Sequence, residues 1–169
     1  MNRIKGIRFL YRKIVLFLVN YVFVGTWFYK TKRILLNSLG FRIGNGSKVV
    51  GPVFCTAQLV VGNDCWIGKD LRIYGNGRVL IGDNCDIAPE VVFVTGGHLI
   101  GDANRRAGEG VSYSIHVGNG SWIGTRSTLL KNVNVGSGCV IASCACVTKS
   151  IKDGMLVGGV PARIIKKLD

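Results

Sequence analysis

The first 63 residues contain no aspartate and no glutamate, although they contain ten lysines and arginines. This absence of acidic side chains makes the N-terminal part of the chain strongly basic, and the whole chain has a formal net charge of +13. Such a segment favours an anionic partner, which is either a membrane surface or a nucleic acid. The aromatic residues of the segment lie among aliphatic residues and do not interleave with the cations, so we expect no nucleic-acid partner.

Proline and histidine are also scarce. Three prolines against 24 glycines suit a chain with many tight corners and exclude a proline-rich linker. Six cysteines are present, but no CxxC pair, P-loop or GxGxxG motif occurs. We interpret the cysteines as small buried thiols of a protein in a reducing cytosol.

The longest apolar run, residues 14–29, is shorter than the roughly 20 residues that a bilayer-spanning helix requires. Only Asn20 and Thr26 interrupt it as clearly polar residues, cations flank it on both sides, and no convincing signal-peptide cleavage site follows. We expect residues 1–40 to form an interfacial helix or a helical hairpin on the cytoplasmic leaflet. A helical cap on the following domain and a short membrane-spanning helix are the alternatives.

Aliphatic residues recur at every sixth position between residues 115 and 151, which is neither the helical period nor the alternation of a strand. A period of six indicates a hexapeptide β-helix, in which each repeat supplies one short strand and one corner. A small residue often follows the aliphatic one and lets the backbone turn without a clash. The inward aliphatic residues are Val117, Ile123, Leu129, Val135, Ile141 and Val147, and the small inward residues are Ser121, Ser127, Val133, Cys139 and Ala145.

The period extends backwards through a two-residue slip at residues 75–77, so we predict five or six triangular coils over residues 43–151. It fails before Val117, where we expect residues 100–116 to form a polar, flexible loop. After Ile151 we expect a C-terminal cap, residues 152–169, with a short basic helix that covers the last coil. The predicted fold is mainly β: a helical segment over residues 1–40 and a repeat domain over residues 41–169.

Four stretches occur in order within the repeat domain: IGDNCDIAPEVVFVTGGH, HVGNGSWIG, VGSGCVIASCACVTKSI and GGVPARIIKKL. Together they resemble the hexapeptide-repeat acyltransferases, above all the maltose and galactoside O-acetyltransferases, over about residues 40–169. The resemblance implies a left-handed parallel β-helix, a homotrimer with active sites between subunits, and acetyl-CoA as the acyl donor. The left hand rests on the resemblance alone, because ordinary crossover connections are right-handed.

The resemblance implies that His98 is the catalytic base. An imidazole with an unperturbed pKa near 6.5 is suited to take the proton of a hydroxyl group. The hydroxyl oxygen would then attack the thioester carbonyl, and backbone N–H groups would stabilise the oxyanion. The other histidine, His116, precedes the inward Val117, so we expect it to point outward from the prism.

The remaining candidate residues also follow from the resemblance. Lys149 and Arg163 would meet the phosphates of the nucleotide, although either cation could simply be solvated. Asp70 stands where related sugar acetyltransferases carry an asparagine, and this difference leaves the identity of the acceptor open. Asp70 is a candidate for binding the acceptor, or alternatively a surface residue at a corner of the coil. Glu90 is a candidate for orienting the base or the acceptor. The expected acetyl-CoA contacts are Trp122, Thr125, Ser143, Thr148, Lys149 and Arg163.

These observations predict an acetyl-CoA-dependent O-acetyltransferase that acts on a sugar hydroxyl of a polysaccharide or lipid-linked precursor. We expect it in the cytoplasm, with possible peripheral contact to the inner membrane face through residues 1–40. An amino-sugar N-acetyltransferase and a non-catalytic β-helix scaffold at the membrane are the alternatives. We expect no metal, because the zinc-dependent carbonic anhydrases of this fold need three imidazoles and the chain has two histidines.

Overall fold

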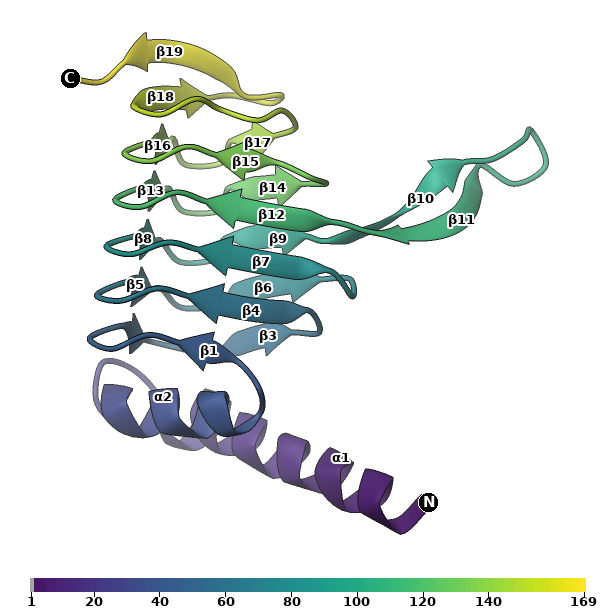
Figure 1. Ribbon diagram of the computed structural model, residues 1–169, viewed down its shortest axis with the longest axis vertical. Coiled ribbons are helices and arrows are strands. Elements are labelled where there is room, and N and C mark those ends of the chain that lie inside the picture. The colour runs from purple at the N-terminus through teal and green to yellow at the C-terminus, as the bar shows by residue number, and fades with distance from the viewer. Residues whose placement is uncertain (1) are drawn as a thin grey trace.

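The computed structural model describes residues 2–169, so Met1 of the predicted segment 1–40 lies outside the described residues. The chain forms a tall prism of stacked coils with two helices below one end (Figure 1). Helix α1 (Asn2–Phe17) continues into a π-helical turn, η1 (Leu18–Val22), and helix α2 (Tyr29–Ser38) follows. Gly40, with φ +90°, supplies the left-handed conformation that ends α2.

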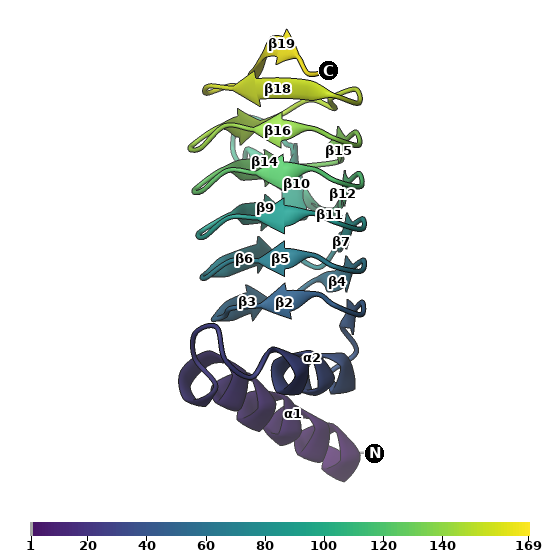
Figure 2. The same cartoon turned by 90° about the vertical axis from the view of Figure 1, so that its left-hand side faces the viewer.

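Three parallel sheets form the sides of the prism, because each coil contributes one strand to each side (Figure 2). There are five complete coils and a sixth that one strand begins, which confirms the predicted β-helix. The first sheet contains β1 (Arg42–Ile43), β4 (Gln58–Val61), β7 (Arg78–Ile81), β12 (Ser114–Val117) and β15 (Asn134–Val135). The second sheet contains β2 (Lys48–Val49), β5 (Trp66–Ile67), β8 (Asp86–Ile87), β13 (Trp122–Ile123), β16 (Val140–Ile141) and β18 (Met155–Gly158). The third sheet contains β3 (Val53–Cys55), β6 (Leu71–Tyr74), β9 (Val92–Val94), β14 (Thr128–Leu130) and β17 (Cys146–Val147).

The interior of the prism holds the two inward positions of the repeat. All the aliphatic and small residues predicted to point inward are buried, from Val117 and Ser121 to Val147. The buried Ser121 hydroxyl donates to the Gly136 carbonyl of the next coil at 2.9 Å. Because the hydroxyl has this partner, its burial lowers the stability of the fold little. Four of the six free cysteines are buried as predicted, whereas Cys144 is exposed at a corner.

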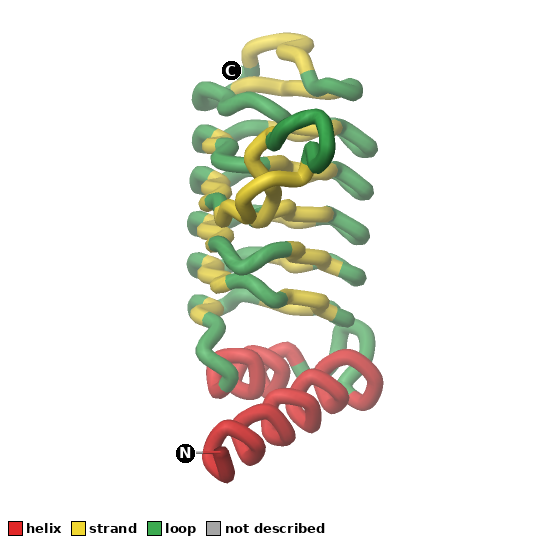
Figure 3. The backbone as a smooth tube through the Cα atoms, turned by 90° about the vertical axis from the view of Figure 1, so that its right-hand side faces the viewer, coloured by secondary structure: helices red, strands yellow, loops and turns green. Residues whose placement is uncertain are grey.

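The predicted loop over residues 100–116 is instead a β-hairpin that projects from the prism (Figure 3). Strand β10 (Gly96–Ile100) pairs antiparallel with β11 (Ala107–Ser112). The carboxylate of Asp102 accepts the backbone N–H groups of Asn104 and Arg105 in the turn. Both faces of this ladder are largely open to solvent, so its strands carry none of the alternating apolar residues by which a half-buried strand is recognised.

The short basic helix predicted within the C-terminal cap, residues 152–169, is wrong. Residues Arg163–Lys167 form strand β19, which runs antiparallel to β18 and covers the last edge of the second sheet. Two adjacent β-branched residues, Ile164 and Ile165, favour a strand, and the unpaired edge of β18 supplies the hydrogen-bond partners. The cap itself is present, but as a sheet edge strand.

The helical segment caps the other end of the prism. Val15 and Val19 of the first helical stretch and Leu36 of α2 are buried together with the residues of the first coil. The amino group of Lys32 is also buried; it donates to the carbonyls of Gly25 and Val50 at 2.6 and 2.8 Å, and burial lowers its pKa. The helical segment therefore packs on the prism as a cap, and within residues 2–169 no helix has the length and apolarity needed to cross a bilayer.

Asn20, a polar break in the apolar run, joins the cap to the first coil. Its side-chain amide donates to the Val53 carbonyl at 3.1 Å, and its side-chain oxygen accepts the Val53 N–H at 2.9 Å. Replacing Asn20 with leucine leaves both backbone groups of Val53 buried without these partners. We expect the free energy of unfolding to fall by about 1–3 kcal/mol.

This expectation is checked by urea denaturation followed by circular dichroism. Asn37→Leu is not a suitable control, because Asn37 also bonds to the backbone of Ile43. Thr31→Val, at an exposed position of α2, is the matched control and should be within about 0.5 kcal/mol of the wild type. Equal stability of Asn20→Leu and wild type would contradict the proposed role of Asn20.

Candidate active site

His98 lies on β10, where the hairpin leaves the prism after β9, and its side chain is exposed. The ring Nδ1 lies 2.8 Å from the Gly108 carbonyl oxygen on the opposite strand of the hairpin. A carbonyl oxygen only accepts hydrogen bonds, so Nδ1 carries the proton in the neutral ring. The lone pair is then on Nε2, and the imidazole is held as a base by its own hairpin.

An open groove of about 540 Å³ lies beside His98. Tyr74, Asn76 and Ser112 contribute side chains to it, and the rest of its lining is rich in glycine. The groove contains the corner at residues 75–77, where the sequence period slips. A Cβ on Gly75, whose φ is +97°, would collide with the backbone of Gly96, so glycine lets the corner and the base of the hairpin approach closely.

Three of the expected acetyl-CoA contacts lie along the second sheet and the corner that follows it. Trp122 of β13 points outward and is 56% exposed. Thr125 and Ser143 occupy equivalent places in successive coils, 18 residues apart. The Thr125 hydroxyl donates to the Pro89 carbonyl at 2.6 Å, which leaves only its lone pairs for a ligand.

Lys149 and Arg163 line one cavity of about 720 Å³ between the last coil and the β18–β19 hairpin, and Thr148 is exposed beside it. Lys152 lines the same cavity and was not among the predicted residues, because it follows the last regular repeat. None of the lining residues, all in the described part of the chain, carries a carboxylate. Three cations without a counter-charge make this cavity suited to phosphate groups.

Asp70 and Glu90 lie elsewhere, at the corner between the second and third sheets. Both adopt a left-handed backbone, with φ of 58° and 61°, in successive coils. The Lys69 amino group is 3.8 Å from the Asp70 carboxylate. Glu90 accepts from Arg126 at 2.7 Å, and this guanidinium lowers the pKa of Glu90.

Glu90 precedes β9 and His98 follows it, so the two residues lie on opposite sides of that strand within one chain. Gly108 holds the imidazole, and Arg126 engages the Glu90 carboxylate. His116 points outward from β12, as predicted.

The groove at His98 and the cationic cavity share no lining residue. The hairpin that carries His98 leaves the prism at about the middle of its height (Figure 1). A single chain therefore presents a base in one place and a cationic cavity in another. Among the described residues, no group of three or more His, Cys, Asp or Glu side chains is placed to hold a metal ion.

Stacked coils with a six-residue repeat place the protein in the class of hexapeptide-repeat proteins, and comparison with known proteins agrees. The family model "Bacterial transferase hexapeptide (six repeats)" matches residues 114–149. Galactoside O-acetyltransferase of Escherichia coli K12 is 31% identical over 137 residues, which cover 80% of this chain and 68% of that protein. The chain belongs to the hexapeptide-repeat acetyltransferase family.

Two further relatives extend this result. Escherichia coli K12 WcaF, an acetyltransferase named for colanic acid biosynthesis, is 26% identical over 141 residues, which cover 82% of this chain and 76% of WcaF. The solved structure of a galactoside acetyltransferase in complex with coenzyme A superposes with a TM-score of 0.81 at 27% identity. That match covers the whole of this chain and 84% of the other.

Proposed function

We propose that the protein transfers an acetyl group from acetyl-CoA to a sugar hydroxyl, with His98 as the general base. The observation that carries this proposal is the bond between His98 Nδ1 and the Gly108 carbonyl, which leaves Nε2 free to accept a proton. The acceptor O–H gives its proton to Nε2 while its oxygen attacks the thioester carbonyl. The carbon–sulfur bond then breaks, and the proton passes from Nε2 to the leaving thiolate.

The donor is supported by the chemistry of the cationic cavity and by the relatives. Lys149, Lys152 and Arg163 offer three positive charges to the phosphates of acetyl-CoA. The galactoside acetyltransferase of similar fold was solved with coenzyme A. Trp122, Thr125, Ser143 and Thr148 would line the path of the pantetheine arm along the coils.

A homotrimer is part of the proposal, because one chain does not unite the base with the cavity. His98 is exposed on a hairpin that projects sideways from the prism, so a neighbouring prism can supply the other wall of the site (Figure 1). The corner that carries Asp70 and Glu90 is a candidate for that wall. In this arrangement the two carboxylates would contact the acceptor held against the partner's imidazole.

The acceptor is proposed to be a polysaccharide or a lipid-linked precursor. The relative named for colanic acid biosynthesis supports a polysaccharide acceptor. A lipid-linked acceptor would bring the enzyme to the inner membrane face, and residues 1–40 are the part of the chain that we propose to make this contact.

The proposal is tested by measuring thiol release from acetyl-CoA in the presence of galactosides, maltose, capsular oligosaccharides and amino sugars, with mass spectrometry of the products. We expect a mass increase of one acetyl group on a hydroxyl of a saccharide. If only amino sugars were acetylated, on their amino groups, the protein would be an N-acetyltransferase and the O-acetyltransferase proposal would be wrong. No turnover with any acceptor would favour the non-catalytic scaffold.

The cationic cavity gives a separate prediction. Lys149→Ala and Arg163→Ala are each expected to raise the KM for acetyl-CoA about tenfold, since each removes one charge-assisted contact to phosphate. The KM for the acceptor should not change. Lys166→Ala, an exposed cation of β19 outside the cavity, is the control and should leave both constants unchanged. An unchanged KM for acetyl-CoA in both cavity variants would show that the cavity does not hold the donor.

A further inference from the structure

The outer side of the helical cap exposes much more apolar surface than the rest of the molecule. Of the 20 large hydrophobic side chains that are exposed in the described residues, 12 lie between Ile7 and Ile34. Trp27 and Phe28, in the connection before α2, are 76% and 56% exposed. Soluble surfaces rarely gather large apolar side chains in this way unless something covers them.

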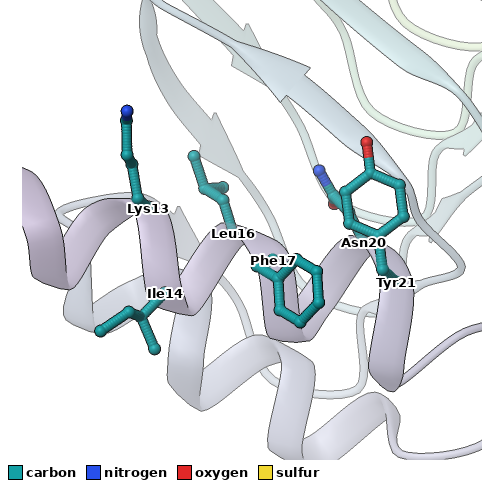
Figure 4. A pocket seen from close by; sticks show the side chains of 6 residues that line it. All are labelled: Lys13, Ile14, Leu16, Phe17, Asn20 and Tyr21. Atoms are coloured by element: carbon teal, nitrogen blue, oxygen red, sulfur yellow. The ribbon is translucent and has the colours of Figure 1, made fainter.

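Helix α1 shows how the exposed residues are arranged. Val15 and Val19 face the first coil and are buried, while a second set of apolar residues follows the spacing of three and four on another side of the helix. Figure 4 shows Ile14 and Lys13 pointing to opposite sides of α1, and it shows Phe17 next to Tyr21. We call this set the outer stripe: Ile7, Leu10, Ile14, Phe17 and Tyr21.

The segment that carries the outer stripe also contains exposed cations, and no carboxylate precedes Asp64. Arg8, Lys13 and Lys30 are exposed. Arg12 is not one of these exposed cations, because its guanidinium donates to the Cys55 carbonyl of the first coil at 2.9 Å. Arg8, Lys13 and Lys30 are therefore the cations that can meet lipid phosphates.

We propose that the outer side of the helical cap docks on an anionic phospholipid bilayer. The outer stripe with Trp27 and Phe28 would lie at the boundary between headgroups and acyl chains, and the cations would meet lipid phosphates. This inference makes the proposed membrane location specific, and it does not depend on acetyl transfer.

A second copy of the chain fits this surface less well. Two identical caps packed face to face would bring together cations from both chains, with no carboxylate in either segment to neutralise them. An anionic bilayer offers both an apolar layer and the missing negative charge. Electrostatic complementarity therefore selects the bilayer as the partner of this surface.

The test is co-sedimentation of the full-length protein with vesicles, without acetyl-CoA or acceptor. We expect binding to vesicles of phosphatidylglycerol and phosphatidylcholine, and binding at least about tenfold weaker to phosphatidylcholine alone, because each cation near an anionic surface adds roughly fivefold to the affinity. High salt should weaken binding to the anionic vesicles.

Two double variants separate the apolar and ionic parts. Trp27→Ser with Phe28→Ser, and Arg8→Glu with Lys13→Glu, should each weaken binding more than about tenfold while the circular dichroism spectrum is unchanged. Ile164→Ser with Ile165→Ser removes equally exposed apolar side chains at the opposite end of the prism and should bind as the wild type does. Wild-type binding by both cap variants, or no binding of the wild type to anionic vesicles, would overturn the proposal. A wild-type protein that binds anionic vesicles but transfers no acetyl group would contradict the proposed function and leave the membrane proposal standing.

Discussion

Replacing His98 by asparagine is expected to lower the rate of acetyl transfer about 10²- to 10⁴-fold, which is the range that a positioned general base contributes. Asparagine keeps a side-chain N–H that can donate to the Gly108 carbonyl, so the hairpin retains this contact. It has no group that can take the proton at the position of Nε2. The loss should therefore appear in kcat, while the KM for acetyl-CoA stays close to the wild-type value.

The control for this experiment is His116→Asn. His116 is exposed on β12, where its backbone pairs with Leu80 and Asn134 of the neighbouring coils, and it lines neither the groove at His98 nor the cationic cavity. We expect its activity to lie within about twofold of the wild type, since such surface substitutions change stability little. If His98→Asn retained wild-type kcat, the general-base assignment would have to be abandoned.

Replacing Gly118 by alanine is expected to lower the free energy of unfolding by about 3 kcal/mol, and to reduce the yield of folded protein. A Cβ at this corner would lie 2.5 Å from the Ser137 nitrogen and 2.6 Å from the Gly136 carbonyl carbon. Both atoms belong to the backbone of the next coil, so neither is able to move as a flexible side chain would. The two coils would have to separate, and their hydrogen bonds would lengthen.

Gly110→Ala is the matched control, because a Cβ at Gly110 meets no atom within 4 Å. Its free energy of unfolding should remain within about 0.5 kcal/mol of the wild type. Denaturation in urea, followed by circular dichroism, measures both variants under one set of conditions. Equal stability of the Gly118 and Gly110 variants would show that the coils have more room at their corners than the structure indicates.

The coils were predictable because their signal is local and repeats. The period from Val117 to Val147 fixes which side chains point inward, and burial confirms each of them. The hairpin was not predictable in the same way, since its strands pack against no core and their residues need no apolar pattern. The last strand, β19, was mistaken for a helix because a basic five-residue segment is too short to show either period.

The residues of the candidate site were likewise predictable only where a local motif identifies them. Motif resemblance was sufficient to single out His98, Lys149 and Arg163. The carbonyl of Gly108 could not be identified in advance, because its contact with His98 depends on the register of a hairpin that the sequence did not reveal. The pairing of Glu90 with Arg126 was hidden too, since the inserted hairpin separates these neighbouring corners by 36 residues instead of 18.

The hairpin leaves the prism at the end of its third coil, and this fixes how far the base stands from the helical cap. Two coil spacings of about 4.8 Å and a helical layer of about 10 Å separate His98 from the outer side of the cap by roughly 20 Å. An enzyme standing upright on a bilayer would hold its imidazole at that height above the headgroups. A sugar attached directly to a lipid phosphate would stay out of reach beneath it. Only a glycan already extended by several sugar units would reach the hairpin. The height of the prism would therefore set the minimum length of a lipid-linked glycan that the enzyme acetylates.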